Sequence, residues 1–205
     1  MKTAARAAAT LLALPALISF AIRSRVLGPN RALLGSTQAL SLIPGVVGQY
    51  VRNAFLRRVL AHCAPSAAIE FGTIFSNVGA RIDDNVYIGP MCHIGFAHLE
   101  HDVLLGAAVH IPSGPDTHGI DDIDVPIREQ TGQLQLVTIG AGSWIAGAAV
   151  VMADVGRNSV VAAGAVVTRP LEAAVIAAGV PAKVVRSRLP GGMPADRAES
   201  RQFRG

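Results

Sequence analysis

The sequence predicts an all-β domain, a parallel β-helix of six-residue repeats, with a helical extension before it and a short polar tail after it. The first observation is that aliphatic residues recur every six positions through the middle of the 205-residue chain. The second is the composition, which has 21 glycines but only 4% aromatic residues, so small and β-branched side chains must form the core. An apolar fraction of 51% is enough to bury a sizeable core.

The repeat unit is six residues long, and a few intervals between apolar positions are shorter. An amphipathic helix repeats near 3.6 residues and a strand near 2, so neither pattern accounts for it. Six residues make one short strand and one turn, and three such units close a triangular coil that stacks about 4.8 Å from the next. The aliphatic positions predicted to point inward are Ile82, Ile88, Ile94, Leu99, Leu105, Ile111, Ile139, Ile145, Val151, Val155, Val161 and Val167.

Residues 1–62 form a basic, apolar segment that we expect to be helical. The first 69 residues contain eight Lys and Arg and no acid, whereas the remainder holds ten basic residues against fourteen acids, which gives charges of +8 and −4. These arginines are interleaved with aliphatic runs and not with base-stacking aromatics. The segment therefore favours an anionic membrane surface as a partner and argues against nucleic acid.

Several interpretations of this segment remain open. The stretch AAATLLALPALISFA resembles a signal peptide, with Ser19-Phe20-Ala21 as a weak cleavage site, and Pro15 interrupts it as a membrane span. Residues 41–60 predict an amphipathic helix that lies on a membrane or caps the core. In the membrane alternative, one face is lipid-directed and three arginines lie near the headgroups: Val47, Val51, Phe55 and Val59, with Arg52, Arg57 and Arg58.

The repeat domain spans residues 63–188 and is interrupted by a polar stretch. IPSGPDTHGIDDIDVPIREQ holds one histidine, four aspartates and one glutamate, and it predicts a loop over residues 112–137 that projects from the coil. A long loop without repeats is more often functional than structural. Residues 189–205 are polar and rich in helix breakers, which predicts a loose tail.

The motifs IDDNVYIGPMCHIG, VTIGAGSWIAGAAVVMADV and the closing GVPAKVVRSR resemble the hexapeptide-repeat acyltransferases. This left-handed β-helix family includes galactoside and maltose acetyltransferases and many polysaccharide O-acetyltransferases. The resemblance covers about residues 69–188 and implies a homotrimer that uses acetyl-CoA as acyl donor. The upstream LSLIPGVVGQYVRNAFLRRVL is similar to the leader of the surface-polysaccharide branch.

The resemblance also implies a set of catalytic residues. The family's catalytic histidine falls on His118, followed by Asp121, or alternatively Asp116, as the group that orients the ring. A neutral imidazole takes the proton of an attacking hydroxyl, which is worth about 10²–10⁴-fold in rate. The backbone N–H of Gly147 is the expected oxyanion donor. Positions that match the family's cofactor groove are Trp144, Gly147, Ala163, Thr168, Arg169, Lys183 and Arg186.

Other functions compete with acetyl transfer. His93 and His98, with His110 and His118 nearby, resemble the zinc ligands of γ-carbonic anhydrases. The family's earlier histidine has only His62 as a candidate, outside the repeats. A catalytically silent scaffold is the third class. The favoured interpretation is an acetyl-CoA O-acetyltransferase without a metal, acting on a saccharide hydroxyl of a surface polysaccharide or lipid-linked sugar. An amino-sugar nitrogen or a small metabolite is the alternative acceptor.

The compartment follows from the donor and from the cysteines. Acetyl-CoA indicates the cytoplasm, at most peripheral on the inner face of the membrane. Cys63 and Cys92 are too few for a disulfide framework, which agrees with a reduced compartment.

Overall fold

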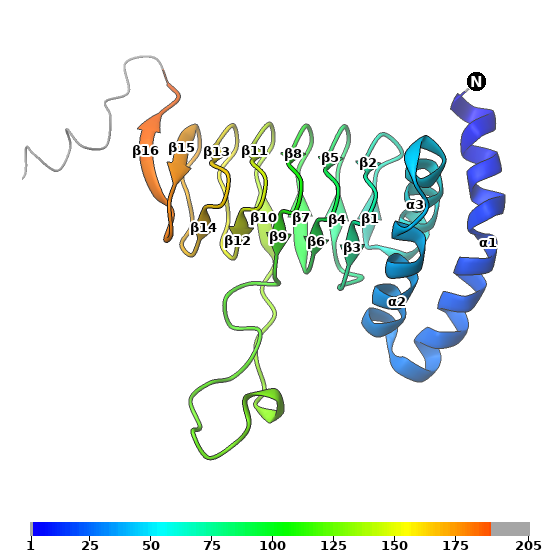
Figure 1. Ribbon diagram of the computed structural model, residues 1–205, viewed down its shortest axis with the longest axis horizontal. Helices are drawn as coiled ribbons and strands as arrows, with labels where there is room; N and C mark the ends of the chain where they lie inside the picture. The colour runs from blue at the N-terminus through cyan, green and yellow to red at the C-terminus, as the bar shows by residue number, and fades with distance from the viewer. Residues whose placement is uncertain (1, 190–205) are drawn as a thin grey trace, which may run out of the picture.

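The computed structural model describes residues 2–189 and has three helices at one end of a long, three-sided β-helix (Figure 1). The predicted tail, apart from its first residue, lies outside the described residues. The helices are α1 (Lys2–Leu27), α2 (Pro29–Ser41) and α3 (Gly45–Val59). They cover the end of the β-helix at which its first strands lie (Figure 1).

The strands form three sheets, one on each side of the triangular coil. The first sheet has the order β1-β4-β7-β10, the second β16-β15-β13-β11-β8-β5-β2, and the third β14-β12-β9-β6-β3. All pairs are parallel except β15 with β16, which closes the second sheet with an antiparallel strand. The strands are β1 (His62–Cys63), β2 (Ala68–Ile69), β3 (Ile74–Phe75), β4 (Arg81–Ile82), β5 (Tyr87–Ile88), β6 (His93–Ile94), β7 (Ala97–Leu99), β8 (Leu104–Leu105), β9 (His110–Ile111), β10 (Val137–Ile139), β11 (Trp144–Ile145), β12 (Val150–Val151), β13 (Val160–Val161), β14 (Val166–Val167), β15 (Val175–Ala178) and β16 (Lys183–Ser187).

The predicted inward positions are confirmed as the core of the β-helix. All twelve aliphatic residues of the repeat, from Ile82 to Val167, are at most 2% exposed. In most strands one residue points inward and its neighbour points outward, because successive side chains alternate across a strand. The outward residues of each strand are therefore available for a site.

Two buried serines connect successive coils in the second half of the β-helix. The hydroxyl of Ser143 donates to the carbonyl of Gly156 and accepts from the backbone N–H of Ser159. Ser159 repeats the arrangement one coil later with Glu172 and Val175. Because each buried hydroxyl has both a donor and an acceptor partner, it stabilises the stack without leaving an unpaired polar group.

The interpretation of residues 41–60 as a lipid-facing helix is wrong for three of its residues. Val51 and Phe55 of α3 are 2% and 0% exposed and pack in the core against the first coils. Arg52 is also buried, and its guanidinium donates to the carbonyls of Ile69, Leu40 and Ile43. The apolar stripe of α3 thus faces the β-helix, because the open end of the coil presents apolar side chains that need a cover.

Pro15 does not interrupt the first apolar segment, contrary to the sequence expectation. Helix α1 runs unbroken through Pro15 from Lys2 to Leu27. A proline removes one backbone hydrogen bond, and here packing against α2 and α3 keeps the helix continuous. By length and composition, Ala4–Leu27 of α1 is a helix that could cross a membrane.

Candidate active site

The projecting loop leaves the β-helix after β9 and returns at β10 (Figure 1). Its two limbs are held together by backbone hydrogen bonds from Gln133 to Asp116 and from Gln135 to Ser113, at 2.7 and 2.8 Å. At the tip, the side-chain amide of Gln130 donates to the carbonyls of Asp122 and Val125. These contacts give a long polar segment a defined path without a hydrophobic core of its own.

His118 lies in this loop and is exposed. The returning limb passes close to it at Gly132, where a Cβ atom would lie 2.5 Å from the His118 backbone nitrogen and 2.3 Å from the Thr117 carbonyl. Only glycine permits that approach without a shift of the histidine. Gly132 therefore fixes the position of His118, and sequence reasoning missed it because the contact joins residues fourteen positions apart.

Asp121 and Asp116, the two candidates for orienting the imidazole, are also exposed in the loop. Within the described part of the chain, no hydrogen bond joins either carboxylate to the side chain of His118. The structure thus places the three predicted residues in one segment but does not pair them. An orienting contact requires a rearrangement of the loop or a group from elsewhere.

Trp144 and Arg186 lie in one row on the outer face of the second sheet. The row runs from Trp144 on β11 through Val160 on β13 and Ile176 on β15 to Arg186 on β16. Two strands therefore separate Trp144 from Arg186. At about 4.8 Å per strand, the row from Trp144 to Arg186 is about 14 Å long. Trp144 is 49% exposed, and Lys183 and Arg186 are exposed on β16. The outer face of the second sheet thus combines an aromatic surface on β11 with two cations on β16.

Gly147 lies at the corner that joins the second sheet to the third. The backbone N–H of Gly147 makes no hydrogen bond within residues 2–189, whereas its carbonyl accepts from Gly164 at 3.0 Å. On the preceding coil, a Cβ atom at Gly106 would lie 2.6 Å from the Gly147 nitrogen. Gly106, which sequence reasoning missed, therefore leaves this donor uncovered. The exposed Ala163 lies at the same corner one coil later.

Thr168 and Arg169 lie at the opposite corner, where the third sheet meets the first. Thr168 lines a pocket of about 200 Å³ at the foot of the loop, together with Pro115, Gln135 and Asp154. Both residues are exposed. Thr168 and Arg169 are therefore separated from the other predicted cofactor residues, which lie on the second sheet or at its corner with the third.

A single chain does not bring the predicted base to the predicted donor groove. In Figure 1 the loop that carries His118 projects from one side of the β-helix, whereas β8, β11 and β13 run along the other side. Trp144 belongs to β11. The structure thus does not bring the loop of His118 to the strand of Trp144 within one chain.

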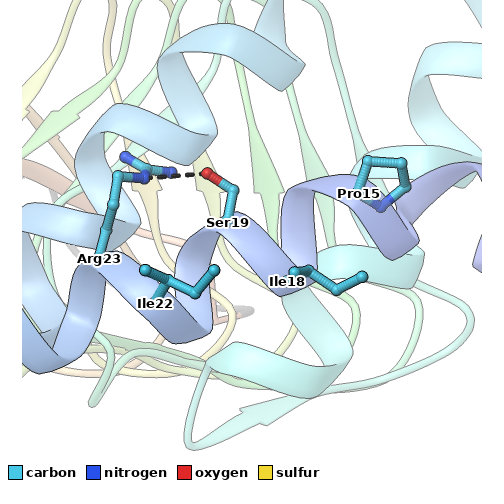
Figure 2. A pocket seen from close by; sticks show the side chains of 5 residues that line it. All are labelled: Pro15, Ile18, Ser19, Ile22 and Arg23. Atoms are coloured by element: carbon cyan, nitrogen blue, oxygen red, sulfur yellow. Dashed lines mark hydrogen bonds between the residues drawn. The ribbon is translucent and has the colours of Figure 1, made fainter.

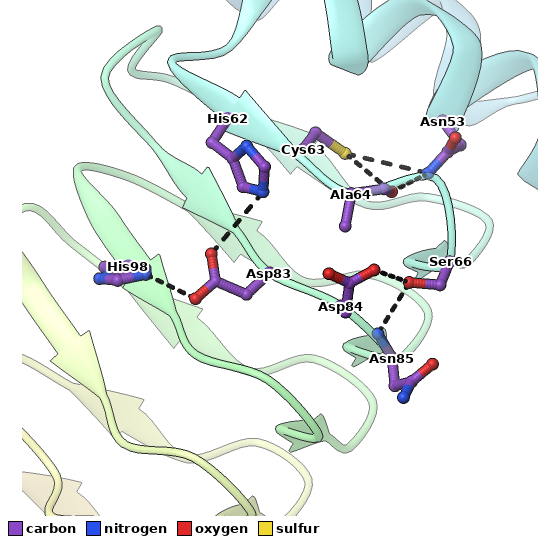
Figure 3. Close-up of polar contacts among 9 residues, drawn as sticks. All are labelled: Asn53, His62, Cys63, Ala64, Ser66, Asp83, Asp84, Asn85 and His98. Carbon is purple, nitrogen blue, oxygen red and sulfur yellow. Dashed lines mark hydrogen bonds and ion pairs between the residues drawn. The ribbon is translucent and has the colours of Figure 1, made fainter.

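The histidines of the zinc alternative lie on different sides of the coil. His93 and His110 stack on the third sheet, whereas His98 lies on the first sheet. There Asp83 bridges two histidines, with its Oδ2 3.0 Å from His98 Nε2 and its Oδ1 3.8 Å from His62 Nε2 (Figure 3). No group of three or more potential ligands among residues 2–189 has the geometry of a metal site. His93 and His98 thus do not form a zinc site within one chain.

Comparison with other proteins gives one relative by sequence and several solved structures with the same fold. The chain is 34% identical over 146 residues to the Saccharomyces cerevisiae protein named "Putative acetyltransferase YJL218W", a match that covers 66% of this chain and 70% of that protein. No protein-family model matches the chain.

Solved structures establish the fold as the left-handed β-helix of such enzymes. A hexapeptide-repeat acetyltransferase from Vibrio cholerae, complexed with acetyl coenzyme A, has a TM-score of 0.66 at 20% identity and covers 82% of this chain and 92% of its own. A maltose O-acetyltransferase from Clostridium difficile has a TM-score of 0.67 at 18% identity, with 78% and 89% covered. A galactoside acetyltransferase in complex with coenzyme A has a TM-score of 0.67 at 22% identity, with 83% of each chain covered.

Proposed function

The chain belongs to the hexapeptide-repeat acetyltransferases, and from that premise we propose that it transfers the acetyl group of acetyl-CoA to a hydroxyl of a saccharide. The observation that carries the proposal is the loop between β9 and β10, which holds an exposed histidine away from the coil. The outer face of the same β-helix carries the row from Trp144 to Arg186, which suits an extended, anionic donor. The acceptor class is supported by the likeness to maltose and galactoside acetyltransferases.

His118 is the general base of the proposed reaction. Its imidazole takes the proton of the acceptor hydroxyl as the oxygen attacks the thioester carbonyl carbon. The resulting tetrahedral oxyanion accepts a hydrogen bond from the N–H of Gly147, a donor typically worth about 3–4 kcal/mol. The intermediate then collapses, the carbon–sulfur bond breaks, and the imidazolium returns its proton to the coenzyme A thiolate. The products are an acetyl ester and free coenzyme A, with no acyl-enzyme.

The donor is proposed to lie along the outer face of the second sheet. Trp144 packs against the pantetheine arm, and Lys183 with Arg186 faces the phosphates of the nucleotide end. Ala163 at the neighbouring corner has a small side chain that allows close approach to the backbone. Thr168 and Arg169, at the foot of the loop, are assigned to the same groove by the family pattern and belong there only if a neighbouring copy completes it.

Assembly as a homotrimer completes the site in this account. The loop of one copy reaches across to the second sheet of the next, which brings His118 to Gly147 and Trp144 of a neighbour. The outward residues Tyr87, Leu104 and Trp144 form an exposed apolar row on that sheet, which is the kind of surface that a second copy covers.

The proposed compartment is the cytoplasm, where acetyl-CoA is available. Cys63 and Cys92 are buried free thiols, and burial raises their pKa to about 12 and about 11. They are thus protonated and unreactive at neutral pH.

The substrate class is tested by incubating the purified chain with acetyl-CoA and separate panels of saccharides, lipid-linked sugars, amino sugars and small hydroxylated metabolites. Release of coenzyme A is followed with a thiol reagent, and products are identified by mass spectrometry. We expect an alkali-labile acetyl ester on a saccharide hydroxyl. An alkali-stable amide on an amino sugar would replace the proposal with the alternative acceptor, and thiol release that no acceptor accelerates would contradict it.

A further inference from the structure

Helix α1 carries an apolar face that the described part of the chain does not cover. Side chains at helical spacing along this face are 59–80% exposed, namely Leu11, Ile18, Ile22 and Val26. The neighbouring Leu12 and Leu14 add 61% and 42% exposed side chains to the same region. A contiguous apolar surface of this kind marks a binding face and not an ordinary protein surface.

The other face of α1 is fixed to the protein. Ala9 and Ala13 are buried against the remaining helices, and Phe20 packs edge to face against Phe55 with ring centroids 5.9 Å apart. Arg23 adds a hydrogen bond of 2.7 Å from its guanidinium to the hydroxyl of Ser36 on α2. The helix is thus apolar nearly all round, which is typical of a helix with apolar neighbours on both sides.

The uncovered face has hollows that apolar groups can fill. Ile18 and Ile22 lie beside Pro15 in a shallow depression of about 500 Å³, bordered by Ser19 and Arg23, which are joined by a hydrogen bond (Figure 2). A second groove of about 270 Å³ runs between α1 and α3, where its lining is almost entirely apolar and includes Leu12, Val46 and Val47. Val46 and Val47 are 65% and 60% exposed, so the apolar surface continues from α1 onto the start of α3.

The helices that form this surface carry basic residues and no acidic ones. Residues 1–69 contain eight Lys and Arg and no Asp or Glu. Arg25 in the last turn of α1 and Arg31 in α2 are exposed, as are Arg57 and Arg58 at the end of α3. An apolar face on helices that carry cations and no carboxylate of their own is complementary to an anionic lipid surface, where each nearby cation strengthens binding.

We propose that α1 lies flat in the surface of an anionic bilayer, with Leu11, Ile18, Ile22 and Val26 among the acyl chains and the arginines at the headgroups. Lying flat keeps the packing of Ala9, Ala13 and Phe20 intact, whereas a spanning helix loses it. In Figure 1, α1 crosses the end of the molecule on the far side of α2 and α3, so the β-helix extends away from the lipid. The inference replaces α3 with α1 as the membrane element and does not depend on the proposed acetyl transfer.

The test compares two matched double variants of the full chain in vesicle co-sedimentation. Ile18→Ser with Ile22→Ser removes two exposed isoleucines from α1, and Ile123→Ser with Ile127→Ser removes two from the loop, where they are 95% and 56% exposed. We expect wild type and the loop variant to bind vesicles of phosphatidylcholine mixed with phosphatidylglycerol, and the α1 variant to bind at least about tenfold more weakly. Binding to pure phosphatidylcholine should be weaker for all three chains, and added salt should weaken the anionic binding.

Other occupants of this face give different results. Equal binding of the two double variants, or no binding of wild type, would overturn the proposal. Retention of wild type in native membranes after alkaline carbonate extraction would show a spanning helix instead. A smaller sedimentation coefficient of the α1 variant without lipid would show that the face binds another copy of the chain. Loss of the first residues in the intact mass of the protein from cells would show a signal peptide.

Discussion

The imidazole rings of His93 and His110 stack on neighbouring coils, with centroids 4.8 Å apart and planes inclined by 16°. Burial lowers the pKa of both rings, and the charge of His110 lowers that of His93 further. His93 Nε2 is buried and makes no hydrogen bond with the described residues. Protonation of this pair therefore places charge where it has poor solvation and a like-charged neighbour.

The stacked histidine pair should lower the free energy of unfolding in acid. Because the folded pKa of each histidine lies below its ordinary value, the unfolded chain binds more protons at mildly acidic pH. The stabilisation is present above the unfolded pKa, near 6.5, and declines as the pH falls from there through the lower folded values. His93→Phe keeps an aromatic stack but cannot titrate, so its urea midpoint should fall less than that of wild type between about pH 7.5 and about pH 5.5. The same fall in both proteins would show that other groups control the acid sensitivity.

Gly132→Ala should inactivate the enzyme without unfolding it. Its Cβ atom would collide with the Thr117 carbonyl and the His118 nitrogen, so the loop must move and carry the imidazole with it. A displacement of about 1 Å costs on the order of 10²-fold in kcat. Thr131→Ala is the control, because Thr131 is the neighbour of Gly132 in the same loop, is exposed, and has no side-chain hydrogen bond with the described residues. Steady-state kinetics and thermal melting of both variants check this, and unchanged kcat in Gly132→Ala would show that the loop adapts.

Arg52→Met should destabilise the chain by about 2–4 kcal/mol, because it removes the guanidinium donor from the carbonyls of Ile69, Leu40 and Ile43, the first two of which are buried contacts. Arg57→Met is the matched control on the same helix. Arg57 is exposed, so its loss should change stability by less than about 0.5 kcal/mol. Urea unfolding of the two variants measures both values. Equal effects would mean that the buried hydrogen bonds of Arg52 contribute nothing beyond its charge.

Mixed oligomers test whether the site is shared between copies. His118→Ala and Trp144→Ala each impair one half of the proposed site, and neither chain alone should be active at limiting acetyl-CoA. In a one-to-one mixture refolded together, random assembly gives about a quarter of sites both an intact His118 and an intact Trp144 from different copies, so about a quarter of wild-type activity should return. A mixture as inactive as its components would place both residues in the same chain's site and contradict the account of assembly.

The repeat was predictable from the sequence because the backbone itself sets the six-residue period. Each inward position, such as Ile88 or Ile145, needs an apolar side chain whatever the rest of the molecule does. The loop was predictable because its polar residues have no six-residue period and therefore cannot form the apolar interior of a coil. The same patterns do not reveal on which side of the β-helix the loop projects, and so do not show that it lies away from the strand of Trp144.

The helices show where sequence patterns stop being informative. The spacing of Val51 and Phe55 indicates an apolar stripe but not what covers it, and lipid and protein leave the same pattern. Arg52 was assigned to headgroups because a charge is normally exposed, whereas its acceptors come from three other segments that only the tertiary structure brings together. The approach of Gly132 to His118 is likewise a tertiary contact between ordinary loop residues.

The most direct test of the account is the turnover of His118→Ala together with its affinity for acetyl-CoA. In the proposed mechanism the imidazole acts on the acceptor proton and not on the nucleotide. The value of kcat should therefore fall at least about 10²-fold, while the dissociation constant for acetyl-CoA from calorimetry stays within about twofold of wild type. A variant that keeps more than about a tenth of wild-type kcat would contradict the assignment of His118 as the general base.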